Sequence, residues 1–264
     1  MNEEDQQEIQ SRKGIYLLPN LLTTGALFAG FYAIVAAMDG RFEAAAVAVF
    51  VAIVLDGLDG RIARMTHTTS AFGAEYDSLS DMVSFGLAPS LVMYEWALVH
   101  LKPLGWIWAK MGWLAAFFYA AAAALRLARF NTLVGSTDRR YFIGLPSPTA
   151  AAVLMGMVWT WHDLGVPGAE MRIPALILTV LVGALMVSRV RYYSFKDFDM
   201  RHRVPFVAVL IIVLVFMFAA LDPPKVLFGG FLLYTVLGPF VSVRLRRRAV
   251  RAASEAGKPP SDDL

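Results

Sequence analysis

The chain has 264 residues, of which 58% are apolar, and a formal net charge of only +3. Its mean hydropathy of +0.56 lies well above that of most water-soluble domains. These values exclude a soluble protein with a single core, and they leave no room for a large catalytic domain outside a membrane. Because the sequence contains no cysteine, disulfides, thiolate metal sites and cysteine nucleophiles are excluded as well.

Apolar stretches of about 20 residues, the length that crosses a bilayer, follow one another along nearly the whole chain. We predict eight spans, near residues 17–38, 42–62, 79–100, 105–128, 146–163, 173–190, 204–221 and 226–243. The predicted fold is therefore all-α, a polytopic transmembrane helix bundle. A polar N-terminal segment, 1–14, precedes a transmembrane catalytic domain at 15–248. The polar tail at 249–264 contains two prolines, and we expect it to be disordered.

The basic residues predict the orientation of this bundle. With eight spans, all but five of the 24 Lys and Arg residues fall on one side. The exceptions are Arg41, Lys102, Lys110, Arg172 and Lys225. Basic residues concentrate in cytoplasmic loops, so both termini are expected in the cytoplasm. We therefore expect a protein of the cell inner membrane that interacts with membrane lipid, and we expect no nucleic-acid partner.

Four carboxylates near the predicted membrane edge are the candidate functional residues. Asp56 and Asp59 are spaced i, i+3 and Asp77 and Asp81 are spaced i, i+4, so each pair shares one face of a helix. Unpaired carboxylates are costly there, and four of them together repel one another. Divalent cations would compensate them, and oxygen ligands suit Mg²⁺ or Mn²⁺. Two such ions could clamp a phosphate or pyrophosphate.

The residues beside these aspartates fit such a ligand. Gly60 and Gly73 remove side chains where a nucleotide or pyrophosphate would approach the backbone. Arg64, one turn after Asp59, adds positive charge that could contact a phosphate oxygen. An aliphatic hydroxyl group needs a base at neutral pH, and Asp81, the last of the four, is the candidate.

These residues carry a family resemblance. The segment from Asp56 to Asp81 resembles the signature of the CDP-alcohol phosphatidyltransferases, D-x-x-D-G-x-x-A-R-x8-G-x3-D-x3-D, at every fixed position. The resemblance implies an integral membrane enzyme in which a hydroxyl group attacks the β-phosphorus of a CDP-linked lipid and CMP leaves. It implies that Asp56, Asp59 and Asp77 ligate metals, and that Asp81 ligates the second metal and serves as the general base.

The same resemblance implies a nucleotide site and a partner. Gly60, Ala63 and Arg64 would lie in the nucleotide site, and Asn20 and Thr23 resemble the contact that the first helix of the family makes on the cytidine side. Dimerisation is typical of the family, so a homodimer is expected. Stretches rich in Gly and Ala in the first, second and fourth predicted spans suit either a dimer or a dense bundle.

Three runs outside the signature resemble the branch of the family that makes phosphatidylserine from CDP-diacylglycerol and L-serine: 84–89, 124–131 and 144–149. Arg126, Arg129 and Ser147 are therefore the candidate contacts to serine. A cation and a helix N-terminus suit the carboxylate of a free amino acid. Arginines at a cytoplasmic helix end also reach lipid phosphates, so orientation alone explains Arg126 and Arg129 equally simply.

Two alternatives remain open at the level of sequence. The acceptor could be glycerol 3-phosphate or an inositol phosphate, which would require further cations such as Arg139, Arg140, Arg189 and Arg191. The acidic residues could instead belong to a divalent-cation channel or transporter. Conduction requires sites along the whole path through the bilayer, however, and these acids lie at one face only.

Overall fold

A computed structural model describes residues 3–66, 68, 70–133, 141–193, 214, 217–218 and 220–255. This part of the chain is mainly helical. Its helices and helical turns are α1 (Glu3–Met38), α2 (Phe42–Met65), α3 (Ala71–Asp81), a π-helical segment (Met82–Leu87), α4 (Ala88–Trp96), a 3-10 helix (Leu98–Leu104), α5 (Trp106–Leu133), α6 (Ser147–Asp163), α7 (Arg172–Val187) and α9 (Pro223–Glu255). The predicted helical bundle is confirmed in this coarse form.

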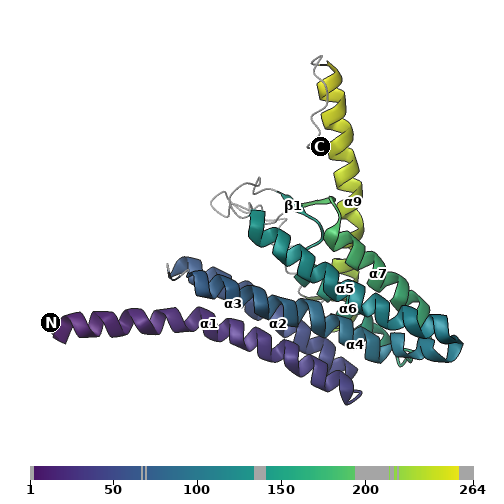
Figure 1. Cartoon of the computed structure of the whole chain (residues 1–264), viewed down its shortest axis with the longest axis horizontal. Coiled ribbons are helices and arrows are strands. Elements are labelled where there is room, and N and C mark those ends of the chain that lie inside the picture. Colours follow the sequence, from purple (N-terminus) through teal and green to yellow (C-terminus); the bar gives the residue numbers. More distant parts are fainter. Residues whose placement is uncertain are drawn as a thin grey trace.

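The helices pack into one bundle from which two ends project. In Figure 1 the N-terminal part of α1 and the C-terminal part of α9 leave the bundle in different directions. Helix α9 continues to Glu255, so its last turns enter the segment for which the sequence predicted disorder. Most of the predicted span at 204–221 lies outside the described residues.

The structure contains a short antiparallel ribbon that the all-α prediction did not include. Strand β1 (Tyr141–Ile143) pairs with β2 (Arg191–Tyr193), with Phe142 opposite Tyr192. Gly144 follows β1, and its N–H group donates a hydrogen bond of 2.8 Å to the carbonyl oxygen of Val190, the residue before β2. Its φ is +81°, and a Cβ at this position would overlap the carbonyl oxygen of Met186. Strands of three residues carry too little alternation to be recognised in a sequence, so periodicity alone could not reveal this pair.

Small residues bring α1 and α2 close together. The alanines on the facing sides of these helices are almost fully buried: Ala26, Ala33, Ala36, Ala45, Ala46 and Ala52. Small side chains let helix backbones approach closely, which is how membrane bundles gain packing contacts. The Gly- and Ala-rich stretches of α1 and α2 therefore serve packing within a single chain.

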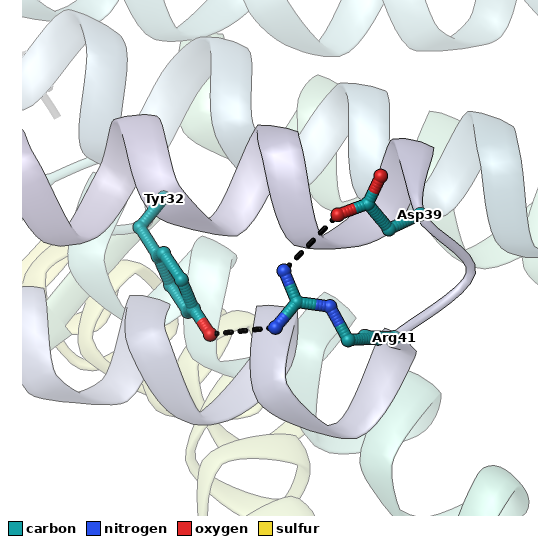
Figure 2. A network of polar contacts seen from close by, with 3 residues as sticks. All are labelled: Tyr32, Asp39 and Arg41. Carbon is teal, nitrogen blue, oxygen red and sulfur yellow. Dashed lines mark hydrogen bonds and ion pairs between the residues drawn. The ribbon is translucent and has the colours of Figure 1, made fainter.

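The turn between α1 and α2 is closed by polar contacts (Figure 2). Arg41 donates a hydrogen bond of 3.1 Å to Asp39 and another of 3.1 Å to the Tyr32 hydroxyl oxygen. The turn itself contains Gly40, with a φ of +72°. These contacts stabilise the hairpin formed by α1 and α2. They lie at the N-terminal end of α2, remote from Asp56 and Asp59.

Among the described residues, two helical stretches are long and apolar enough to cross a membrane, Leu18–Met38 and Trp106–Thr132. A third candidate combines Ala71–Trp96 with Leu98–Leu104, which are bent by 42° relative to each other. Large apolar side chains point outward on these stretches, including Phe28, at 69% exposure, and Phe117, at 63%. Such exposure suits contact with lipid tails.

Candidate metal and acceptor site

Three of the four predicted carboxylates converge. One carboxylate oxygen from each of Asp56, Asp59 and Asp77 lies within 4.8 Å of the others. We call these three residues the aspartate cluster. Asp56 and Asp59 come from α2, and Asp77 comes from α3, which begins after a short turn. Ser70 caps α3 by accepting a hydrogen bond of 3.0 Å from the backbone N–H of Gly73. The cap starts the helix at the register that points Asp77 toward α2.

Asp81 lies beside this cluster. Its side chain contacts that of Asp56, and it lies within electrostatic range of Asp77 and Arg126. Asp81 ends α3, and the π-helical segment follows immediately. The helical spacing that placed Asp77 and Asp81 on one face is thus confirmed, although only three carboxylates form the tight group.

The π-helical segment is held by buried hydrogen bonds from side chains to backbone. Ser84 donates to the carbonyl oxygen of Ala26 at 3.0 Å, and the Tyr119 hydroxyl donates to that of Phe85 at 3.0 Å. One turn earlier, Ser80 donates to the carbonyl of Thr23 at 3.2 Å. Single π-helical turns inside helices occur often at functional sites. Here the turn sets the direction in which the helix continues after Asp81.

Thr23 reaches the cluster from α1. Its hydroxyl lies 2.6 Å from Asp59 Oδ2 and 3.1 Å from the carbonyl oxygen of Pro19. Both Thr23 and Asp59 are buried, at 4% and 5% exposure. The sequence pointed to Thr23 only as a nucleotide contact, and this second relationship depends on packing between α1 and α2.

The donors of the aspartate cluster fit a divalent cation. They are all carboxylate oxygens, the ligand type that Mg²⁺ and Mn²⁺ prefer. Asp77 Oδ1 is buried and has no hydrogen-bond partner. Ion pairs among the described residues involve Asp39 and Asp222, so no Lys or Arg neutralises the cluster in this way. A buried carboxylate without a partner is costly, and a bound cation would relieve that cost.

The residues predicted for the nucleotide border the cluster on two sides. The Arg64 guanidinium folds back toward Gly60, where a Cβ would lie 3.6 Å from its Nη1 atom. A Cβ on Gly73 would lie 3.5 Å from the side-chain oxygen of Asn20. Ala63 is half-buried in α2, on the turn between Gly60 and Arg64. The structure thus brings these positions around the cluster, and their contact with a nucleotide stays a prediction.

The predicted acceptor residues separate into two groups. Arg126 Nη1 donates a hydrogen bond of 2.7 Å to the Ser147 hydroxyl oxygen, joining α5 to the first residue of α6. The Nε atom of Arg126 is buried without a hydrogen-bond partner. Arg129 is exposed on α5 and takes no part in this contact. Arg126 and Ser147 are therefore the two residues that the structure places together, on the side of Asp81.

Two further contacts near the site had no signal in the sequence. Asn131 donates from α5 to the Ser78 hydroxyl oxygen at 3.0 Å, and Tyr76 and Thr24 share a hydrogen bond of 2.9 Å. These contacts tie α3 to α5 and to α1 on either side of Asp77. Each joins residues more than 50 positions apart, so no local pattern identifies it.

Comparison with the sequences of known proteins points to one family. A sequence model of a family described as CDP-alcohol phosphatidyltransferase matches residues 16–187. The CDP-diacylglycerol–serine O-phosphatidyltransferase of Helicobacter pylori (strain ATCC 700392 / 26695) is 35% identical over 223 residues, which cover 84% of this chain and 91% of that protein. All four aspartates and Arg126 lie within the matched range 16–187.

Two other relatives extend this similarity. The protein of the same name from Mycobacterium tuberculosis (strain ATCC 25618 / H37Rv) is 36% identical over 156 residues, covering 56% of this chain and 52% of that protein. An archaetidylserine synthase from Methanothermobacter thermautotrophicus is 33% identical over 177 residues, covering 66% and 69%. The names of the bacterial and the archaeal relatives thus both refer to serine, although they describe different lipids.

Proposed function

The chain belongs to the CDP-alcohol phosphatidyltransferase family, and we propose that it transfers the phosphatidyl group of CDP-diacylglycerol to the hydroxyl group of L-serine. The products are phosphatidylserine and CMP. The observation that carries the proposal is the position of Asp81, whose side chain contacts that of Asp56 in the aspartate cluster and lies within electrostatic range of Arg126. In this proposal Asp81 is the base for the acceptor hydroxyl group, and it is close both to the residues that would bind the pyrophosphate and to a cation for the acceptor.

In the proposed reaction the serine hydroxyl oxygen forms a bond to the β-phosphorus. The bond from this phosphorus to the bridging pyrophosphate oxygen breaks, and CMP leaves with that oxygen. Asp81 accepts the proton of the serine hydroxyl group. Asp56, Asp59 and Asp77 would hold divalent cations, with Asp81 completing the second site. When bound, Mg²⁺ or Mn²⁺ would neutralise the charge of the pyrophosphate and stabilise the leaving phosphate.

The protein residues contribute mainly by positioning. Thr23 orients Asp59. We assign Arg64 to the phosphates, and Asn20, Gly60, Ala63 and Gly73 to the nucleotide. Arg126 and Ser147 would bind the serine carboxylate. Arg129, which is exposed, would bind lipid headgroups or help to orient the protein in the membrane. Holding two reactants in a reactive geometry supplies a large part of the rate in transfers of this kind.

The family and the apolar helices together indicate an integral membrane protein. We propose that it has eight spans and cytoplasmic termini, lies in the inner membrane and exposes its site to cytosolic serine. The excess of basic residues on one side supports this orientation. A homodimer is proposed from the family resemblance alone.

A substrate panel tests the proposed function. Purified protein is given CDP-diacylglycerol and Mn²⁺ with labelled L-serine, glycerol 3-phosphate, inositol phosphate or no acceptor, and CMP and lipid product are measured. We expect serine to give phosphatidylserine, and the two phosphorylated acceptors to stay near the background without acceptor. Faster reaction with glycerol 3-phosphate would leave the aspartate mechanism in place and overturn the choice of serine.

A further inference from the structure

The protein contains a buried tyrosine that the proposed reaction does not use. Tyr119 lies in the middle of α5 and is fully buried, and its hydroxyl donates a hydrogen bond of 3.0 Å to the carbonyl oxygen of Phe85 in the π-helical segment. A phenylalanine would fill the same space without burying a polar group, which is costly unless it is hydrogen-bonded. The hydroxyl group therefore serves its partner, the Phe85 carbonyl.

The sequence explains why this carbonyl needs a donor from another helix. In an α-helix it would accept from the backbone N–H of residue 89, four positions later. Residue 89 is a proline near the start of α4, and proline has no N–H group. The helix passes this proline in the π-helical segment, where the N–H of Ala88 donates to the carbonyl of Val83, five positions earlier. Tyr119 thus supplies the donor that Pro89 lacks.

Two further contacts show how this part of the chain lies along α5. A Cβ on Gly86, the residue after Phe85, would lie 3.3 Å from the Cβ atom of Ala123. Toward the other end, Asn131 donates to the Ser78 hydroxyl oxygen at 3.0 Å. Residue numbers fall along α3 and the π-helical segment as they rise along α5, so the two helices run in opposite directions.

Asp81 and Arg126 lie between these two contacts. Asp81 ends α3, after Ser78 and before the π-helical segment, and Arg126 lies between the contacting residues of α5. The antiparallel packing therefore places Asp81 and Arg126 at about the same level. Phe85 follows Asp81 by four positions, about one helical turn. The bond from Tyr119 thus fixes the chain one turn beyond the candidate base.

We propose that Tyr119 is a positioning residue for Asp81. By holding the Phe85 carbonyl, it keeps the π-helical segment packed against α5 and so keeps the Asp81 carboxylate within reach of the acceptor hydroxyl group. A general base must lie within hydrogen-bond distance of the proton it takes, and misplacement by about 1 Å can cost about 100-fold in rate. Asp56 and Asp59 belong to α2, so these metal ligands do not depend on the bond. The inference rests on the proposed function, in which Asp81 is the base.

The variant Tyr119→Phe tests this inference, because it keeps the ring and removes only the hydroxyl group. In the full-length enzyme we expect kcat with L-serine to fall by about 10- to 100-fold. The KM for CDP-diacylglycerol and the Mn²⁺-dependent binding of this lipid should stay nearly unchanged, which also shows that the variant folds. An unchanged kcat, or a loss of lipid binding in proportion to the loss of kcat, would overturn the inference.

Tyr192→Phe is the matched control. Tyr192 is also fully buried, and its hydroxyl also donates to a backbone carbonyl, that of Thr235, at 3.2 Å. This variant therefore loses the same kind of hydrogen bond, but between β2 and α9. Its kcat should stay close to that of the unmodified enzyme, and an equal fall in the two variants would overturn a specific role for Tyr119.

A double-mutant cycle with Asp81→Asn gives a readout that general destabilisation would not change. If Tyr119 acts through Asp81, removing its hydroxyl group will lower CMP release little further once Asp81 can no longer accept a proton. Multiplicative losses in the double variant would mean that Tyr119 affects the rate by another route, and they would overturn the inference.

The inference and the proposed function can fail separately. If the unmodified enzyme released CMP only with another alcohol, serine would be wrong as the acceptor, and the same cycle with that alcohol would decide the role of Tyr119. If Asp81→Asn kept the full kcat, Asp81 would not be the base, and the inference would fail with that assignment.

Discussion

Thr23 and Asp59 are joined by a hydrogen bond of 2.6 Å between the Thr23 hydroxyl and the Asp59 carboxylate, although 36 positions separate them in the chain. Both side chains are buried, so water does not readily replace either partner. The bond leaves the other carboxylate oxygen of Asp59 for a different partner. A residue of α1 therefore orients a candidate metal ligand on α2, in addition to any contact it makes with a nucleotide.

Replacing Thr23 by valine should weaken the response to metal. Val has nearly the same shape and cannot donate, and the loss of a partner that orients a metal ligand typically costs about 10–100-fold in metal affinity or activity. Titration of CMP release against Mn²⁺ measures this shift. Thr23→Ser should restore most of the response. As a control, Thr24→Val removes a neighbouring hydroxyl that bonds Asn20 and Tyr76 instead. An equal shift in both valine variants would contradict a specific role for Thr23.

Asp77→Ala should abolish turnover. Asp77 supplies one of the three converging oxygens and carries a buried oxygen without a partner, so its removal deprives a cation of a ligand. We also expect metal-dependent binding of CDP-diacylglycerol to fall, as followed by equilibrium binding with and without Mn²⁺. Asp56→Ala should behave in the same way. Normal turnover in excess EDTA would refute the metal mechanism as a whole.

The variant Asp81→Asn tests whether Asp81 acts as the general base or only as a metal ligand. The amide keeps the size and one acceptor oxygen but cannot take up the serine proton, so the rate should fall by about 10² to 10⁴. Binding of CDP-diacylglycerol in the presence of Mn²⁺ should decrease much less than in Asp77→Ala. Comparable losses of binding in the two variants would make Asp81 a ligand only and leave the base unassigned.

Gly30→Ala should destabilise the protein through the π-helical segment. A Cβ at Gly30 would lie 2.6 Å from the Ser84 hydroxyl oxygen and 2.7 Å from its Cα atom, too close without a shift of the backbone. Overpacking of this kind typically costs about 1–3 kcal/mol. Gly229→Ala is the matched control, because nothing lies within 4 Å of its added Cβ. Thermal unfolding in detergent should show a lower Tm for Gly30→Ala alone, and equal Tm values would contradict the close packing.

Reporter fusions test the proposed topology. A reporter that is active only after export should give a signal when fused after residue 40 or 165, and none when fused after 70, 140 or 198. The expectation follows from the distribution of the 24 basic residues over the two sides. Export from position 70 would place the aspartates on the side away from cytosolic serine.

Local helix geometry explains why much of the candidate metal site could be predicted. Residues three or four positions apart share a helix face, so the spacing of Asp56 and Asp59 and that of Asp77 and Asp81 required no tertiary information. Given the signature, it also followed that the two faces would meet. The predicted roles of these residues, and those of Asn20 and Arg64, remain predictions for the experiments above.

The arrangement of the predicted acceptor residues depends far more on tertiary packing, so less of it could be predicted. Arg126 and Ser147 were both candidates, but their 2.7 Å contact and the separation of Arg129 follow from how α5 meets α6. The ribbon of β1 and β2 was missed because two strands of three residues have no periodic signal.

By itself the sequence determined the helical class, the abundance of apolar stretches and the aspartates at helical spacing, because composition and spacing along one helix are local properties. Only the tertiary structure decided that Thr23 orients Asp59, that a π-helical segment follows Asp81, and that Arg126 of α5 contacts Ser147 of α6. Each of these relationships joins separate helices or depends on the side chains of a neighbouring helix. Its physical cause is the close packing of small residues between helices, which spacing along the chain does not encode.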